Sequence, residues 1–293
     1  MRLAFLSAFV LAGLSTSVVA HAQSTITDRP FDLVAGNGVW GSFLPDYELG
    51  TSGSGAPAFR DQLSDVGYYG DIKAIRRFLG TRTSFEARGF YAYSGSRSSS
   101  GAGNIDVPDP ITGGSNLFSG GPADLSSDTD HYGFHVGLRD TWRTRFGGLS
   151  GGCYFSYMAF DQTFDVDFGP TRLMSETLNS DYTGGKGFVG WDGCLCGSPS
   201  TLDFIVGFYQ LRTDYRYSGG AVPGTRALTM HKTPITLETV FSNYHNVHGY
   251  QVGLTFAATY IAQMPVIEHN VGRPVSLDTD SGVLVRLMFE ILL

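Results

Sequence analysis

Apolar and polar residues alternate along the stretch 130–161. One set of alternate positions is apolar: Tyr132, Phe134, Val136 and Leu138. The positions between them are His131, Gly133, His135, Gly137 and Arg139. After Gly147 and Gly148 the alternation resumes through Cys153, Phe155, Tyr157 and Ala159. A period of two predicts strands with one apolar and one polar face. The stretch therefore predicts a hairpin with arms of about 15 residues, against about 5–6 for a soluble strand.

The same rhythm recurs and predicts ten strands. Besides the two arms of 130–161, we expect strands at 31–44, 66–79, 82–94, 186–194, 201–217, 226–241, 249–262 and 281–293. Long polar, Gly-rich connections are expected at 45–64, 94–129, 168–185, 218–225 and 264–280, with 171–178 as an alternative strand extension. Short turns alternate with them, at Gly80, Gly147, Gly197 and 244–248. Long and short connections therefore alternate strictly along the chain.

Strand length and connection pattern together indicate a membrane protein. A tilted transmembrane strand needs about 9–11 residues for the hydrocarbon and more to clear the headgroups. Bacterial barrels have an even number of strands, short periplasmic turns and long external loops. The expected fold is all-β: a closed, antiparallel, transmembrane up-and-down β-barrel of ten strands over residues 23–293, with N and C termini periplasmic.

Composition and the start of the chain agree with export to such a site. The 293 residues are 42% hydrophobic and 16% charged, with 39 Gly, 15 Tyr and 21 Phe, which suits a closed sheet with aromatic girdles. Residues 1–22 have the pattern of a secretory signal: Arg2, an apolar run over 3–14, and Ala20-His21-Ala22. No 18-residue apolar run follows, which excludes helical spans. The net charge of −7, without a basic patch, argues against nucleic acid as a partner.

The signal, the hairpin rhythm and the amphipathic last strand resemble those of bacterial outer-membrane β-barrel proteins, over residues 31–293. In the last strand, Asp280, Gly282, Val285 and Leu287 fit the assembly signal of that class, although Leu293 stands where Phe or Trp is usual. The resemblance implies the outer membrane of a Gram-negative cell envelope as the location. It also implies outer-membrane lipid and the barrel-assembly machinery as partners.

Seven charged or titratable residues are expected inside the barrel by strand parity. They are Glu86, Arg88, His135, Arg139, Glu238, Arg286 and Glu290. A barrel of about ten strands is barely wider than its own side chains, so these charges should pair. One interpretation is an internal salt-bridge network that holds the barrel together. The other is a charged constriction that selects small solutes.

Acidic pairs at the outer strand ends give an alternative function. Asp128 and Asp130 lie next to His131, and Asp165 and Asp167 follow on the neighbouring strand. The arrangement resembles the rim of omptin proteases, but adjacent Asp130 and His131 should face opposite sides of the sheet. Solvated loop acids or a weak calcium site are the other interpretations. We expect a non-enzymatic protein, either a porin-like narrow channel or a structural, surface-exposed membrane protein that meets external ligands. We expect no catalytic residues, metal or cofactor. The alternative is a rim-active hydrolase.

Three cysteines make an odd set: Cys153, Cys194 and Cys196. In an oxidising compartment one pair can bond and leave one free thiol. The predicted strands place Cys153 and the other two near the periplasmic ends of neighbouring antiparallel strands. The sequence therefore predicts that Cys153 lies close to Cys194 or Cys196, with a disulfide as one outcome and free thiols as the other.

Overall fold

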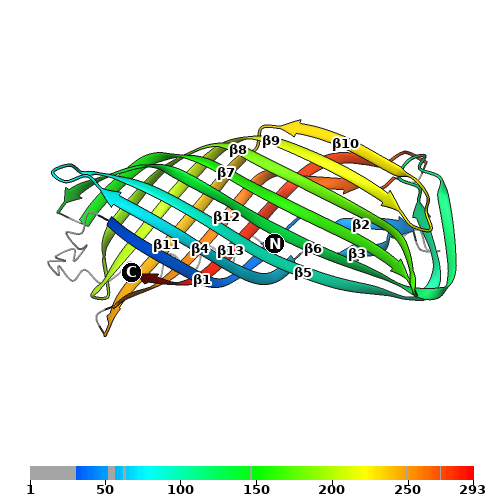
Figure 1. Cartoon of the computed structure of the whole chain (residues 1–293), viewed down its shortest axis with the longest axis horizontal. Helices are drawn as coiled ribbons and strands as arrows, with labels where there is room; N and C mark the ends of the chain where they lie inside the picture. The colour runs from blue at the N-terminus through cyan, green and yellow to red at the C-terminus, as the bar shows by residue number, and fades with distance from the viewer. Residues whose placement is uncertain (1–30, 52–56, 62–63, 146, 249, 271) are drawn as a thin grey trace.

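We describe the protein from a computed structural model, which covers residues 31–293 apart from 52–56, 62–63, 146, 249 and 271 (Figure 1). The predicted signal sequence lies outside the described residues. Within them the chain is all-β, and its thirteen strands belong to one antiparallel sheet. The strands are β1 (Phe31–Phe43), β2 (Tyr47–Thr51), β3 (Pro57–Asp61), β4 (Ser64–Arg77), β5 (Thr83–Pro108), β6 (Ser115–Thr144), β7 (Gly147–Phe168), β8 (Thr171–Leu195), β9 (Ser198–Gly219), β10 (Thr225–Lys232), β11 (Ile235–Val247), β12 (Tyr250–Glu268) and β13 (Ser276–Leu292).

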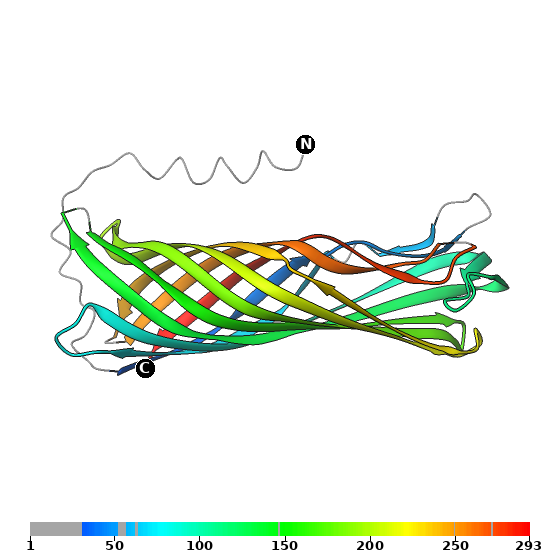
Figure 2. The same ribbon diagram turned by 90° about the horizontal axis from the view of Figure 1, so that it is seen from above.

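Ten of these strands form a nearly closed ring (Figures 1 and 2). Around it the order is β1, β4, β5, β6, β7, β8, β9, β11, β12 and β13, and β13 returns to pair with β1. This confirms a ring of ten antiparallel strands, although the predicted strand 226–241 divides before Pro234 into β10, which lies off the ring, and β11, which lies in it. Among the described residues the ring is interrupted near one end, where β10 pairs with β9 alone and β1 leaves β13 beyond Phe43. The short turns, the start of β1 and the end of β13 share the opposite end.

The predicted loops at 94–129 and 168–185 are wrong, because most of each is strand, and those at 45–64 and 264–280 also contain strand residues. β5 and β6 stay paired from Thr83 opposite Asp140 to Pro108 opposite Ser115. β7 and β8 pair up to Phe168 opposite Thr171, so the alternative extension at 171–178 holds. The Ser, Gly and Asp residues that suggested a loop lie along these long ladders, where continuous antiparallel hydrogen bonding overrides weak strand propensity.

The polarity of the sheet inverts along the strands. In the half of the ring with the short turns, β6 exposes Phe134 and Leu138 on the outer face and buries Arg139 inside. In the other half, β6 buries Leu125 inside and carries Asp124 and Asp128 outside. We call these two parts the banded half and the outer half. The inversion explains the missed strands, because the apolar residues of the outer half lie on the face opposite to the expected one.

The outer half is filled and capped. Its interior is an apolar core that includes Phe160, Leu178, Tyr215 and Tyr217. At its tip the turns meet: the Gly272 N–H donates to the Gly113 carbonyl at 3.0 Å. Gly113 has φ of 74°, and a Cβ there would lie 2.3 Å from the backbone of the residue after Gly272, so only glycine fits this contact.

Candidate functional site

The interior of the banded half contains paired charges, and Glu238 on β11 lies at the centre of one group. Arg286 on β13 pairs with one of its carboxylate oxygens and donates to the Tyr69 hydroxyl at 3.0 Å. Lys186 on β8 donates to the other oxygen at 3.0 Å. Because Lys186 and Arg286 lie on opposite sides of β11, this carboxylate ties three non-adjacent strands together.

A second group surrounds Arg139, near the short turns. Its guanidinium reaches from β6 across the interior to Asp203 on β9, with both nitrogen–oxygen distances at 3.0 Å. It also donates to Asp192 at 3.0 Å and to the Ser150 hydroxyl at 2.7 Å. A forked contact to a carboxylate suits the planar guanidinium and fixes its position. Arg139 therefore links β6 to β7, β8 and β9 at this level.

The third group joins β4 and β5. Arg88 pairs with Asp71, and Lys73 lies 3.4 Å from the Glu86 carboxylate. Tyr154 donates to Glu86 at 2.8 Å. In the described residues each of these charges therefore has a partner within the interior, as the cost of an unpaired buried charge requires.

All seven residues expected in the interior lie on the inner face. Glu86, Arg139, Glu238, Arg286 and Glu290 are each less than a tenth exposed. His135 packs against Tyr154, with ring centres 5.2 Å apart, and the Glu290 carboxylate accepts from Tyr244 at 2.7 Å. Five further members were missed by sequence reasoning: Asp71, Lys73, Lys186, Asp192 and Asp203. Neighbouring residues of a strand face opposite sides, so the outward position of Phe204 would have placed Asp203 inside. Around Lys186 and Asp192 the sequence lacks a clear alternation of apolar residues, and it gave no such signal.

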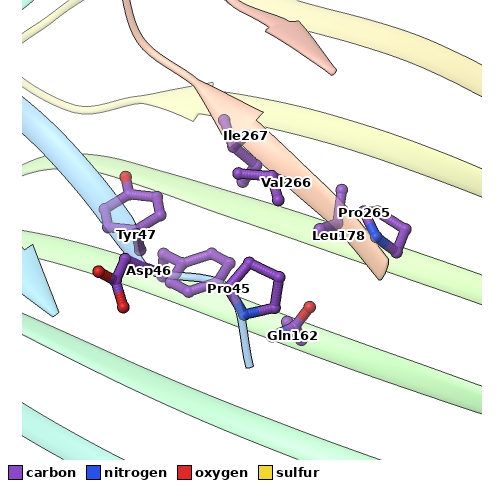
Figure 3. A pocket seen from close by; sticks show the side chains of 9 residues that line it. Pro45, Asp46, Tyr47, Gln162, Leu178, Pro265, Val266 and Ile267 are labelled. Atoms are coloured by element: carbon purple, nitrogen blue, oxygen red, sulfur yellow. The ribbon is translucent and has the colours of Figure 1, made fainter. Parts of the chain in front are cut away.

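Above the charges, the chain itself fills the ring. After β1 the segment Leu44–Tyr47, which we call the plug segment, turns inward and packs against β7, β8 and β12 (Figure 3). Tyr47 stacks on Phe164 with ring centres 4.4 Å apart. The space left beside Pro45 and Tyr47 is about 10 Å³, which is room for about one water molecule. The plug segment therefore packs closely against β7, β8 and β12 at this level.

One buried carboxylate holds the plug segment in place. Glu176 on β8 is fully buried and accepts from the hydroxyls of Tyr47 and Tyr215, each at 2.5 Å. His269, just after β12, lies 2.9 Å from the same carboxylate. Burial alone would raise the pKa of Glu176, but His269 and the two hydroxyls outweigh burial and hold the pKa below its usual value. Glu176 thus links the plug segment to β8, β9 and the end of β12.

The residues of the alternative hydrolytic site are separated. His131 is buried inside the ring, stacked on Phe160 with ring centres 3.9 Å apart. Asp130 lies on the outer face and accepts from the Tyr91 hydroxyl, and Asp128 accepts from Tyr93 at 2.8 Å. On the neighbouring strands Asp165 and Asp167 both pair with Arg172, at 2.9 and 2.6 Å. No pair of these acids shares a face with the His131 ring.

The predicted proximity of the cysteines is wrong. All three thiols are free, and Cys153 pairs in register with Gly187, seven residues before Cys194. At about 3.3 Å per residue, seven residues are about 23 Å along the strand, well beyond the reach of a disulfide. The expectation failed because β7 begins at Gly147, close to the turn, so that Cys153 lies well inside the strand.

The described residues contain no group of three or more His, Cys, Asp or Glu side chains arranged to hold a metal ion. Within the same part of the chain there is no helix of the length and apolar character needed to cross a membrane. The features that the described residues do show are the paired charges of the banded half and the plugged core of the outer half. Comparison of the chain with models of protein families and with curated protein sequences finds no match.

Proposed function

We propose that the protein is an outer-membrane β-barrel whose ring of ten strands spans the lipid bilayer. The inversion of polarity along the strands carries this proposal. In the banded half, large apolar side chains such as Val66, Ile72, Phe204 and Phe289 are more than half exposed on the outer face, while charges lie inside. A lipid-facing apolar band around a polar interior is the pattern of a transmembrane barrel. In the outer half the pattern is that of a water-exposed sheet around an apolar core.

Strand lengths and chain ends support one orientation. β5, β6, β7, β8 and β9 have 22–30 residues, against about 9–11 needed to cross the hydrocarbon, so they extend far beyond it on one side. The short turns, the start of β1 and the end of β13 lie on the other side, which in bacterial barrels is periplasmic. The outer half would then project from the cell surface, and the predicted signal at 1–22 would provide export to the envelope.

In this position the protein acts as a structural, surface-exposed membrane protein and not as an enzyme. Paired charges occupy the membrane-spanning interior, and the plug segment and apolar core fill the outer half. This occlusion favours the structural interpretation over the narrow channel for small solutes. The separation of His131 from Asp130 likewise argues against the rim-active hydrolase. Its partners would be outer-membrane lipid, the barrel-assembly machinery during insertion, and external ligands at the outer half.

Conductance across a planar lipid bilayer tests this function. The refolded wild type should show no steady conductance above that of the lipid alone, because the plug segment and the apolar core lie inside the outer half. The Tyr47→Ala variant removes the ring that anchors the plug segment to Glu176 and Phe164, and it should give brief openings. A steady conductance of the wild type like that of a water-filled porin would overturn the occluded barrel in favour of a channel.

A further inference from the structure

The upper part of β13 has an unpaired edge. β1 pairs with β13 up to Phe43 opposite Val283 and then turns into the ring at Pro45, which has no N–H to donate. On its other side β13 remains paired with β12 as far as Ser276 opposite Glu268. Among the described residues no strand pairs with the free edge of 276–282. An unpaired edge is a template for another strand.

A cavity of about 590 Å³ borders this edge. Four consecutive residues of β13, 278–281, line it, although their side chains alternate between two faces. The cavity therefore follows the backbone edge of the strand. Part of the cavity wall is apolar and consists of Leu44, Pro45, Val266 and Ile267. The volume lies within the range of about 300–1,000 Å³ that is typical of ligand sites.

The walls of this cavity carry negative charge. Asp46, Glu48, Glu268, Asp278 and Asp280 line it, and no lysine or arginine is among the described lining residues. Glu268 accepts from the Ser276 hydroxyl at 3.3 Å, and Asp278 and Asp280 accept from the backbone N–H of the next residue. No described cation forms an ion pair with these last three carboxylates.

The cavity wall also includes a buried polar group that lacks a partner. The side chain of His269 is 1% exposed, and its Nε2 faces Glu176. Its Nδ1 has no hydrogen-bond partner among the described residues. Because the side chain of His269 is covered by the protein, it forms part of the wall and presents no donor or acceptor to the cavity.

We propose that this cavity is a docking groove for an extended, basic peptide segment of an external protein. The peptide would add as a strand to the free edge of β13, so that main-chain hydrogen bonds supply affinity and alternate side chains supply specificity. Its Lys or Arg side chains would meet the carboxylates, and the intervening side chains would lie on the apolar wall. The proposal rests on the orientation proposed above, in which the groove faces the cell exterior.

Fluorescence anisotropy on the refolded full-length protein in detergent tests the groove. The probe is a labelled peptide of about eight residues that alternates Lys and Thr, a length typical of a strand. It should bind at low salt, and the same peptide with Glu in place of Lys should not. A Lys–Thr peptide N-methylated on every backbone nitrogen keeps its charge but cannot donate main-chain hydrogen bonds along either edge. Equal binding of this N-methylated peptide would overturn strand addition.

Matched variants locate the binding. Asp278→Asn with Asp280→Asn removes two carboxylates from the groove and should weaken binding roughly 2- to 30-fold, as expected for two exposed charge pairs. Asp124→Asn with Asp128→Asn removes the same charge from the outer face of β6 and should leave binding unchanged. If both double variants lost the same affinity for the peptide, binding would depend only on the net charge of the protein, and the proposal would be overturned.

Hydrogen exchange separates this proposal from the function proposed above. Bound Lys–Thr peptide should slow exchange of backbone amides within 276–282 and leave those of β6 unchanged. Unchanged exchange at 276–282 would overturn the groove even if the protein proves to be a closed barrel. Conversely, a conducting barrel would overturn the occluded function while protection of 276–282 would still support the groove.

Discussion

Arg286 illustrates how single charged residues act inside the ring. Its guanidinium lies over the Tyr69 ring at 5.2 Å while it pairs with the Glu238 carboxylate. Glu238 is itself shared with Lys186, so removing one cation leaves a buried carboxylate with half of its compensation. A buried ion pair stabilises the folded state little more than well-packed apolar residues in its place would. Removing only one partner is strongly destabilising, because the other charge stays buried without compensation.

We therefore expect Arg286→Ala to lower the free energy of unfolding by about 3–5 kcal/mol. Urea titration of the refolded protein in detergent, followed by tryptophan fluorescence, measures this change. Arg97→Ala is the matched control, because Arg97 pairs with Asp124 at 2.7 Å on the exposed outer face. The control substitution should lower the free energy of unfolding by about 0–1 kcal/mol. Equal losses for the two variants would contradict the buried network.

Glu176 should make the outer half sensitive to acid. Its pKa is lower in the folded protein than its usual value of 4.5. A depressed folded-state pKa adds stability above the unfolded-state pKa, and this stability is lost as pH falls through the folded-state value. Hydrogen exchange in the plug segment should therefore be slow at pH 7 and at pH 5, after correction for intrinsic rates, and should accelerate below about pH 4.5.

Glu176→Gln should exchange faster at pH 7 and lose most of this acid dependence, because glutamine does not titrate. Asp214→Asn serves as the control, since Asp214 lies on the surface of the same half and accepts from Thr229 at 2.7 Å. It should leave the exchange of the plug segment unchanged. Identical pH profiles for wild type and Glu176→Gln would exclude Glu176 as the group that holds the plug segment.

At the scale of the element, β7 combines both environments in one strand. Phe155 faces outward in the banded half, whereas Phe164 and Val166 face the apolar core of the outer half. Cys153 is exposed on the outer face, in the banded half, and Cys196 is exposed at the turn between β8 and β9. The two thiols therefore sample different surroundings if the apolar band lies in lipid.

In liposomes, a charged maleimide should label Cys196 and spare Cys153, while an apolar maleimide should label both. Mass spectrometry of the digested protein identifies the labelled residue. Gels without reductant should show no internal disulfide, since Cys153 and Cys194 lie far apart along the strands. Rapid labelling of Cys153 by the charged reagent would place the outer face of β7 in water and contradict the membrane-spanning band.

At the scale of the whole molecule, closure of the ring should give resistance to unfolding. The pairing of β13 with β1 covers the strand edges that would otherwise be free in the banded half. Opening the ring requires the loss of one complete strand pairing together with the interior charge pairs. A closed ring should therefore remain folded in detergent until it is heated.

We expect the mature chain to begin at Gln23, to fractionate with the outer membrane, and to migrate differently on detergent gels before and after boiling. N-terminal sequencing, membrane fractionation and paired gels measure these three properties. The wild type at room temperature should move as a compact species, and the boiled sample as the unfolded chain. A monodisperse periplasmic pool without a shift on boiling would contradict the membrane barrel.

The sequence alone determined the sheet class and the inward positions of the banded half. The period-two pattern around Phe134 and Leu138 depends only on the local geometry of a strand, so it correctly predicted which residues, such as Arg139 and Arg286, face inside. Counting clear alternations also yielded the ten strands of the ring. These features could be predicted because they repeat at short range along the chain.

Only the tertiary structure decided what fills the ring. Partners such as Arg139 and Asp203 lie 64 residues apart and meet because the curved sheet brings β6 and β9, with β7 and β8 between them, around a shared interior. The long ladders at 94–129 and 168–185 were missed because their apolar residues face inward, where the local pattern was expected to be polar. The plug segment, the Glu176 contacts and the free edge of β13 all depend on where β1 turns inward, and long-range packing decides that position.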